Sequence, residues 1–172
     1  MNKATENNWS EIYKMVNDRP LEDLTMSRNA KLAVELFLGK EWIESTVDYI
    51  VKTDGEAWEL AIKSLRLLES EYATDYAYKI YLNSNNSEHR KQAVFVIKDI
   101  AHRKSIDWVE EFLNDDEVAV WGLGVLDQLL WCERIKPSEQ VEKLLELALT
   151  KYNGGLKEDV DFIRRYLADR EN

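Results

Sequence analysis

The stretch EEFLNDDEVAVWGLGVLDQLLW, residues 110–131, decides the fold of this 172-residue chain. It opens with acidic residues and continues as an almost uncharged apolar run that is flanked by Trp121 and Trp131. Gly122 and Gly124 lie inside this run, although a glycine costs a helix interior roughly 1 kcal/mol relative to alanine. Two glycines in one expected helix therefore indicate close packing of the backbone, or a groove that a bulky side chain would block.

The same arrangement recurs twice upstream of this stretch. Each copy has an apolar helix end, a polar turn and a second helix in which aliphatic residues follow a small residue. The three copies span residues 47–68, 77–100 and 109–130. The small residues are Ala61, Ala93 and Gly122. Paired helices with a period of about 30 residues are typical of helical repeat proteins, in which each pair stacks on the next.

Residues 105–131 resemble the HEAT repeat, a helical repeat of the armadillo type. The matching positions are an apolar pair, an Asp, a Val, a small residue and a Leu: Phe112, Leu113, Asp115 or Asp116, Val118, Gly122 and Leu126. Ala119 stands where the family usually has an arginine. The resemblance implies an all-α domain, a right-handed α-α superhelix of about five helix pairs, over residues 1–172. We expect residues 1–8 to be frayed.

Helical spacing of apolar residues, with polar turns between the segments, predicts ten helices and no strand. The expected helices cover residues 11–16, 28–38, 42–53, 56–70, 71–83, 87–104, 107–113, 117–131, 138–152 and 156–170. Gly39 is expected to end the second helix, and Ser138 to cap the ninth. The last pair carries many charged residues, so we expect it to cap the stack.

A net charge of −10 is the strongest compositional indication of a partner. Such a surface repels phosphate backbones, so binding to nucleic acid would need a local basic patch. The nearest candidates in the sequence are residues 89–91 and 102–104. We therefore expect no nucleic-acid partner, and interpret the charge either as a source of solubility or as attraction to a basic protein.

The sequence also predicts where the protein resides. It contains neither the basic and apolar start of a signal peptide nor an apolar run long enough for a transmembrane helix, so we expect no membrane association. Cys132 is the only cysteine, which excludes a disulfide within the chain. A reducing cytoplasm is the simplest interpretation.

Catalytic and metal-binding motifs are missing from the sequence. There is no phosphate-binding loop, dinucleotide fingerprint, zinc-protease motif or paired-cysteine motif. We therefore expect no enzyme, cofactor or metal. His89 and His102 would lie about 20 Å apart along one expected helix, too far to share a metal ion. His102 is expected at the surface, and Cys132 as a partly buried, inert thiol.

Several aromatic residues fall outside the stripe of core positions. Trp121, Gln128 and Trp131 share one helix face, and Phe95 with Asp99 extends that face onto the preceding repeat. Four acidic residues are expected to border it, namely Asp115, Asp116, Glu117 and Asp127. Two interpretations remain open: the rings fill space between repeats, or they form a surface for contacts with a partner.

Three functions agree with these observations to different degrees. Small acidic helical-repeat proteins of this kind resemble bacterial immunity proteins, which implies binding and neutralisation of a basic, nuclease-type toxin. The alternative is an adaptor or assembly scaffold that binds a peptide or a protein complex. A third possibility comes from HEAT-like enzymes that remove alkylated bases from DNA, but these need a basic groove that a net charge of −10 disfavours.

Overall fold

The computed structural model describes residues 26–151 and 155–170. In this part the chain forms nine α-helices and one 3₁₀-helix, and it contains no strand, which confirms the all-α prediction. The elements are α2 (Met26–Leu38), α3 (Lys40–Lys52), α4 (Trp58–Leu68), α5 (Glu71–Asn83), α6 (Ser87–Ile100), η2 (Arg103–Trp108), α7 (Val109–Asn114), α8 (Ala119–Trp131), α9 (Glu139–Leu149) and α10 (Lys157–Arg170). The expected helix 11–16 and the expected frayed start, 1–8, lie outside the described residues.

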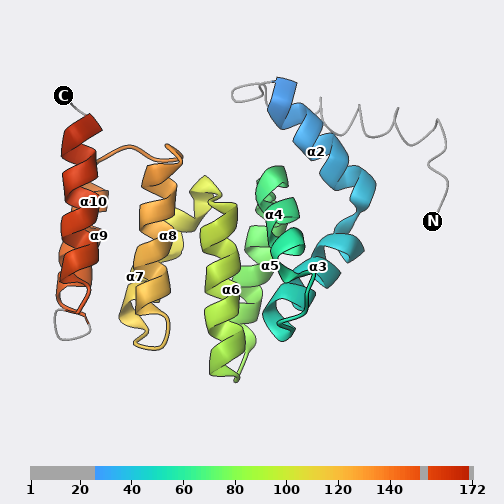
Figure 1. The fold of residues 1–172 in the computed structure, drawn as a ribbon, viewed down its shortest axis with the longest axis horizontal. Coiled ribbons are helices and arrows are strands. Elements are labelled where there is room, and N and C mark those ends of the chain that lie inside the picture. The colour runs from blue at the N-terminus through green and yellow to red at the C-terminus, as the bar shows by residue number, and fades with distance from the viewer. Residues whose placement is uncertain (1–25, 152–154, 171–172) are drawn as a thin grey trace.

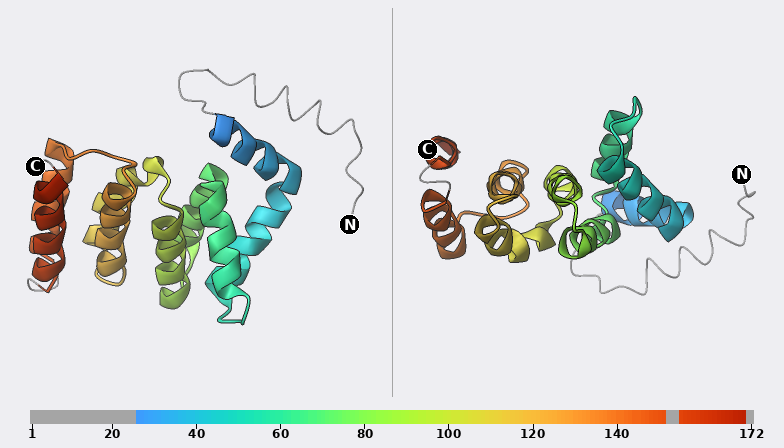
Figure 2. Two further views of the ribbon diagram at one scale, coloured as in Figure 1. Left: turned by 45° about the horizontal axis from the view of Figure 1, so that its top comes forward. Right: turned by 90° about the horizontal axis from the view of Figure 1, so that it is seen from below.

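From α3 onward the helices stand in pairs, α3–α4, α5–α6, α7–α8 and α9–α10, stacked side by side along the molecule (Figure 1). Seen from below, α6, α8 and α10 lie on one side of the stack, and α5, α7 and α9 on the other (Figure 2). We call the side formed by α4, α6, α8 and α10 the even face, and the opposite side the odd face. A right-handed superhelix of five pairs stays a prediction.

The repeated aliphatic positions form the core between the two layers. Each of the three copies has three aliphatic residues at matching positions after its small residue. Eight of these nine side chains are buried: Ile62, Leu65, Val94, Ile97, Ile100, Leu123, Leu126 and Leu129. The ninth, Leu68, is half-buried at the end of α4. Because each repeat contributes the same positions to one continuous core, burial of these side chains drives the pairs to stack.

The end of α6 differs from the sequence prediction of one helix over 87–104. Ala101 adopts the left-handed conformation, with φ of 52°, and ends the helix after Ile100. His102 then caps the 3₁₀-helix, where its Nδ1 accepts a hydrogen bond from the Lys104 amide at 3.4 Å. The two histidines therefore do not share a helix, and the axial distance expected between them does not apply.

The helix starts follow the sequence more closely. Asn86 caps α6, and its side chain accepts hydrogen bonds from the amides of Glu88 and His89. Ser138 caps α9 as predicted, accepting from the Val141 amide at 3.3 Å. Such caps satisfy amide groups that have no partner within the helix.

The two glycines of α8 have different structural reasons. A Cβ atom on Gly122 would lie 2.6 Å from Phe112 Cβ and 3.1 Å from the Phe112 carbonyl carbon. The backbone of α8 therefore packs directly against Phe112 of α7 at this point. A Cβ atom on Gly124 would contact only the side chain of Lys98, at 3.2 Å or more. Close packing, one of the two expectations for these glycines, is confirmed at Gly122.

Tyrosines on α5 connect it to both neighbouring odd-numbered helices. Each hydroxyl donates a hydrogen bond to a carboxylate on α3, or on and just after α7. The pairs are Tyr72–Glu44, Tyr76–Asp48, Tyr78–Glu111 and Tyr81–Asp115. Burial, and then the nearby Asp115 carboxylate, raise the pKa of Tyr81 to about 12, so this hydroxyl keeps its proton and remains a donor. These bonds fix the spacing of the stack on the odd face.

Candidate partner-binding surface

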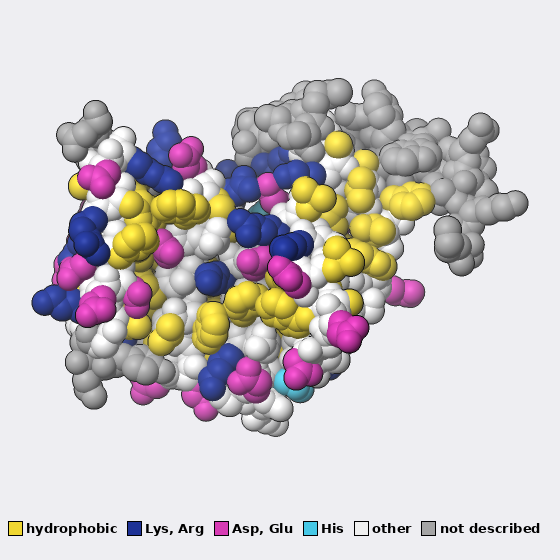
Figure 3. Space-filling view, in the orientation of Figure 1, with side chains coloured by type: hydrophobic (Ala, Val, Ile, Leu, Met, Phe, Trp, Pro, Cys, Tyr) yellow, Lys and Arg dark blue, Asp and Glu magenta, His cyan; other side chains and the backbone are white. Residues whose placement is uncertain are grey.

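Three aromatic rings form a continuous row across the even face. Trp58 of α4 and Phe95 of α6 have ring centroids 5.2 Å apart, and Phe95 meets Trp121 of α8 edge to face at 5.5 Å. All three are half-buried. Hydrophobic side chains form a band across this face of the molecule (Figure 3). We call Trp58, Phe95 and Trp121 the aromatic row.

Neighbouring groups hold the aromatic row in place. The Trp58 indole nitrogen donates a hydrogen bond to the Ile50 carbonyl at 3.0 Å, which anchors the ring to the end of α3. The Lys98 ammonium lies 5.6 Å from the ring centre of Phe95 and 5.7 Å from that of Trp121. Gly124 leaves room for this lysine. The rings thus fill space between repeats and still present part of their surface to solvent.

Trp131 belongs to a second aromatic cluster at the end of the stack. Its side chain is 53% exposed, and it meets Tyr166 of α10 edge to face at 5.4 Å. Phe162 lies beyond Tyr166, and the Arg170 guanidinium lies 5.3 Å from the ring centres of both Trp131 and Tyr166. The aromatic ring next to Trp131 is therefore Tyr166 of α10, and Trp131 lies in a different cluster from Phe95.

Gln128 contacts Cys132 and is only partly exposed to solvent. Its side-chain nitrogen is 2.9 Å from the Cys132 sulfur, and both residues are half-buried. This agrees with the expectation of a partly buried thiol. A catalytic thiol needs a basic partner, whereas the Cys132 sulfur accepts a hydrogen bond from the Gln128 amide.

The acidic residues before α8 are engaged within the chain. Asp115 accepts hydrogen bonds from Arg90 and from the Tyr81 hydroxyl, and its side chain is only 16% exposed. Glu117 pairs with the same Arg90 at 3.0 Å. Asp116 is exposed. Asp115 therefore stabilises the turn between α7 and α8, which leaves Asp116 and Glu117 more accessible to a partner.

The two acidic residues predicted for the binding surface within α6 and α8, Asp99 and Asp127, also have local partners. Asp127 accepts a hydrogen bond from the Tyr166 hydroxyl at 2.9 Å, which ties α8 to α10. Asp99 lies 3.8 Å from the Arg66 guanidinium, and burial raises the pKa of its carboxyl against the opposing influence of that arginine. Asp99 and Phe95 share one face of α6, as the sequence predicted.

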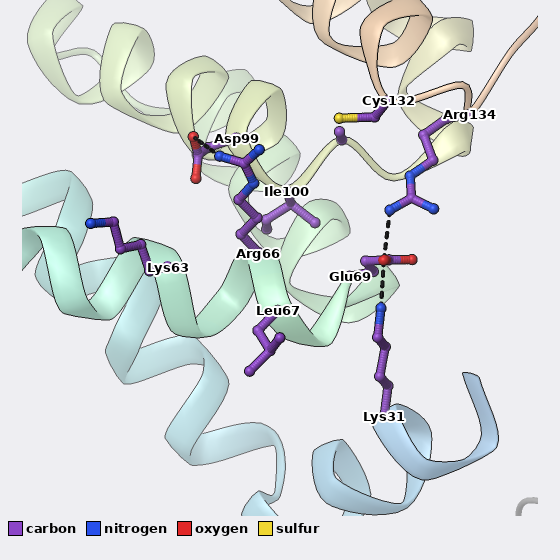
Figure 4. A pocket seen from close by; sticks show the side chains of 10 residues that line it. Lys31, Lys63, Arg66, Leu67, Glu69, Asp99, Ile100, Cys132 and Arg134 are labelled. Carbon is purple, nitrogen blue, oxygen red and sulfur yellow. Dashed lines mark hydrogen bonds and ion pairs between the residues drawn. The ribbon is translucent and has the colours of Figure 1, made fainter. Parts of the chain in front are cut away.

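A pocket of about 300 Å³ opens beside the ends of α4 and α6, the helices that carry Trp58 and Phe95 (Figure 4). Side chains from α2, α4, α6 and the segment after α8 line it: Lys31, Lys63, Arg66, Leu67, Glu69, Asp99, Ile100, Ala101, Cys132 and Arg134. Glu69 Oε1 accepts from Lys31 Nζ at 2.5 Å and lies 2.6 Å from an Arg134 guanidinium nitrogen. We call this the cationic pocket, because four of its residues are lysines or arginines.

Two ion pairs in the cationic pocket stabilise the charged form of Glu69. Partial burial acts to raise the pKa of Glu69, but the hydrogen bonds from Lys31 and Arg134 outweigh it, so the pKa lies below its usual value. Glu69 itself follows α4 in the left-handed conformation, with φ of 52°. This end of α4 thus presents a carboxylate that two cations share.

Sequence reasoning missed this pocket and placed the basic patch elsewhere. Residues 89–91 and 102–104 do not supply it: Arg90 is paired with Asp115 and Glu117, and Lys104 with acidic residues of α5. The cationic residues come from three separate segments, so no local run of basic residues in the sequence could have predicted them. One usable signal is spacing, since Asp99 of the pocket follows Phe95 by four residues and therefore shares its face of α6.

Charge is unequally divided between the two faces. The odd-numbered helices α3, α5, α7 and α9 contain ten acidic and four basic residues, whereas α4, α6, α8 and α10 contain eight acidic and nine basic ones. Among these eight helices, the excess of acidic residues therefore lies on the odd-numbered ones. The aromatic row lies on helices that are close to neutral.

The histidine expected at the surface is half-buried. Burial is the main influence that lowers the pKa of His102; Lys104 adds to this lowering, and Glu71 opposes it. Within residues 26–151 and 155–170, no group of three or more His, Cys, Asp or Glu residues has a metal-binding arrangement. None of the helices described there combines the length and the apolar character that crossing a membrane requires.

Comparison of the chain with protein-family models, curated proteins and solved structures yields no match. The resemblance of residues 105–131 to HEAT repeats therefore stays a prediction.

Proposed function

We propose that this chain is a non-catalytic, HEAT-like protein-binding module that receives a partner protein on its even face. The aromatic row carries the proposal. Energetically important contacts in protein interfaces cluster on rigid, partly exposed aromatic and arginine side chains. Trp58, Phe95 and Trp121 form such a surface across three helix pairs, and packing already fixes them.

The even face offers more surface than the aromatic row alone. Exposed Trp131 and Phe162, with Tyr166 between them, lie at the end of the same face, and Arg170 covers part of the cluster. Exposed aromatic groups of this kind suit contacts with a peptide or with the surface of a larger complex. An adaptor or assembly scaffold fits this distribution best.

A capture experiment with matched variants tests the proposal. Tagged full-length protein, Trp121→Ala, Trp131→Ala and the control Leu82→Ala are exposed to a lysate of the source cells. Leu82 is 54% exposed on α5, outside the even face, so its removal leaves that face intact. Circular dichroism and thermal melts first establish that each variant is folded.

The expected result is a protein that the wild type and Leu82→Ala retain and that both tryptophan variants lose. Loss of one interface tryptophan typically weakens binding by about 2 kcal/mol or more, roughly a thirtyfold change in Kd. If the folded tryptophan variants retain the same proteins as the wild type, the even face is not the binding surface.

The second candidate is an immunity protein that neutralises a basic toxin in the cytoplasm. The specific observation in its favour is the excess of acidic residues on the odd-numbered helices. A basic nuclease would be steered to that side, and salt would slow its association. In this case Asp107→Asn with Glu110→Gln, both exposed in the wild type, should slow association with the captured partner and weaken its salt dependence. An unchanged association rate would argue against this candidate.

A further inference from the structure

The cationic pocket and the aromatic row are adjacent bands on the same helix faces. Asp99 follows Phe95 by one turn on α6, and Arg66 follows Trp58 by about two turns on α4. At 1.5 Å per residue these steps correspond to about 6 Å and 12 Å along the helix axes. A ligand that lies on the row therefore reaches the pocket without leaving the even face.

Four cations and two carboxylates line the pocket, and Lys63 also pairs with Glu59 outside it at 2.5 Å, which leaves three cations against two carboxylates around the opening. Lys31 and Arg134 both bind one oxygen of Glu69, so a single carboxylate serves two cations. The Arg66 guanidinium is 3.8 Å from Asp99, longer than a direct hydrogen bond. Figure 4 shows Arg66, Arg134 and the Cys132 thiol around the same opening. This excess is unusual in a chain whose net charge is −10.

We propose that the cationic pocket binds a carboxylate side chain of an acidic segment of the partner protein, while the aromatic row contacts apolar side chains of the same segment. The inference rests on the proposed function and names the chemistry of the partner. An extended peptide advances about 3.3 Å per residue, so the acidic and apolar side chains stand two to four residues apart. Leu67, Ile100 and Ala101 give the pocket apolar walls for the methylene groups of a glutamate.

The geometry favours a protein segment over a nucleic acid. A phosphate backbone presents charges at regular intervals and is held by cations along a track. Here four cations from three segments gather at one opening, and Lys98 lies over the rings of Phe95 and Trp121. One compact cluster beside an aromatic surface matches one acidic group beside apolar ones.

Cys132 provides a direct reporter of this pocket. It is the only cysteine of the chain, and it lines the opening. Reaction of the full-length protein with a dianionic aromatic disulfide is compared with reaction with a neutral one. We expect Arg134→Gln to lower the ratio of the two rates by about threefold or more, because a positive potential attracts the anionic reagent. The control Arg165→Gln, an exposed cation of α10, should leave the ratio unchanged.

Protection of Cys132 from the neutral reagent then tests the ligand. The probes are a short capped extended peptide with leucines and a glutamate two and four residues apart, so that they face the same side, the same peptide with glutamine, and a short oligothymidylate. We expect only the glutamate peptide to slow the reaction, and Arg66→Gln with Arg134→Gln to abolish this protection while Arg165→Gln preserves it. Equal protection by the glutamine peptide, or stronger protection by the oligothymidylate, would overturn the proposal, as would a rate ratio that Arg134→Gln leaves unchanged.

The two proposals fail in different ways. If captured partners depend on Trp121 and Trp131 but survive Arg66→Gln with Arg134→Gln, the even face binds a protein without using the pocket, and the inference is wrong. If the glutamate peptide protects Cys132 in the wild type while the tryptophan variants retain every partner, the pocket binds carboxylates and the proposed function is wrong.

Discussion

Gly122 and Gly124 lie two residues apart in one helix, yet they tolerate different substitutions. On a helix of this kind, alanine gains roughly 1 kcal/mol over glycine from conformational entropy alone. At Gly122 a methyl group would meet the Cβ and backbone of Phe112, at 2.6 Å and 3.1 Å, and neither can move without shifting α7. At Gly124 it would meet the flexible stem of Lys98.

We therefore expect Gly122→Ala to lower the free energy of unfolding by about 1–2 kcal/mol, since overpacking typically costs about 1–3 kcal/mol and the propensity gain offsets part of it. Gly124→Ala should be neutral or more stable by up to about 1 kcal/mol. Urea unfolding at constant pH measures both. Equal stability of the two variants would mean that α7 and α8 are not in close contact at residue 122.

At the scale of elements, the break after α6 introduces a pH dependence. His102 caps the 3₁₀-helix as a hydrogen-bond acceptor and is half-buried, and burial chiefly lowers the pKa of its imidazole from 6.5. When the pKa of a base is lower in the folded state than in the unfolded state, its full contribution to the free energy of unfolding is present only above the unfolded pKa. This contribution is lost as the pH falls from about 6.5 through the folded pKa, because the unfolded state binds more protons.

His102→Asn removes the titration and keeps a side chain that can accept at the cap. We expect the free energy of unfolding of the wild type to fall more than that of the variant between pH 7.5 and pH 5.5, by at most about 1.4 kcal/mol per pH unit. Urea titrations of both proteins at the two values measure the difference. Parallel pH profiles for the two proteins would show that His102 titrates normally.

The elements also show what the sequence could and could not predict. Helices such as α5 and α9 were predictable, because apolar spacing and caps such as Ser138 are local signals. The end of α6 was not predictable, because the sequence does not indicate that Ala101 adopts the left-handed conformation. The spacing of Phe95 and Trp121 correctly placed them on one surface, whereas the cationic pocket depends on how three distant segments meet.

At the scale of the whole molecule, the helices contact each other mainly within a pair and between pairs that are neighbours in the stack. In such an architecture, stability is close to a sum of pair and interface terms, so an end pair can open by itself. The α9–α10 pair touches α7–α8 less extensively than α5–α6 does, and α10 buries only Val160 and Ile163. Its charged outer face agrees with the predicted role as a cap.

The Tyr166 hydroxyl is one of the groups that tie this last pair to the stack, through its hydrogen bond to Asp127 at 2.9 Å. Burial, and then Asp127, raise the pKa of this hydroxyl, so it remains a donor. Tyr166→Phe removes a bond that contributes about 1 kcal/mol, and we expect backbone amides of α10 to exchange about fivefold faster with deuterium. Amides of α6 should keep their wild-type rates and serve as the internal reference. Equal acceleration in α6 and α10, measured by mass spectrometry, would show that the stack opens as one cooperative unit rather than from its end.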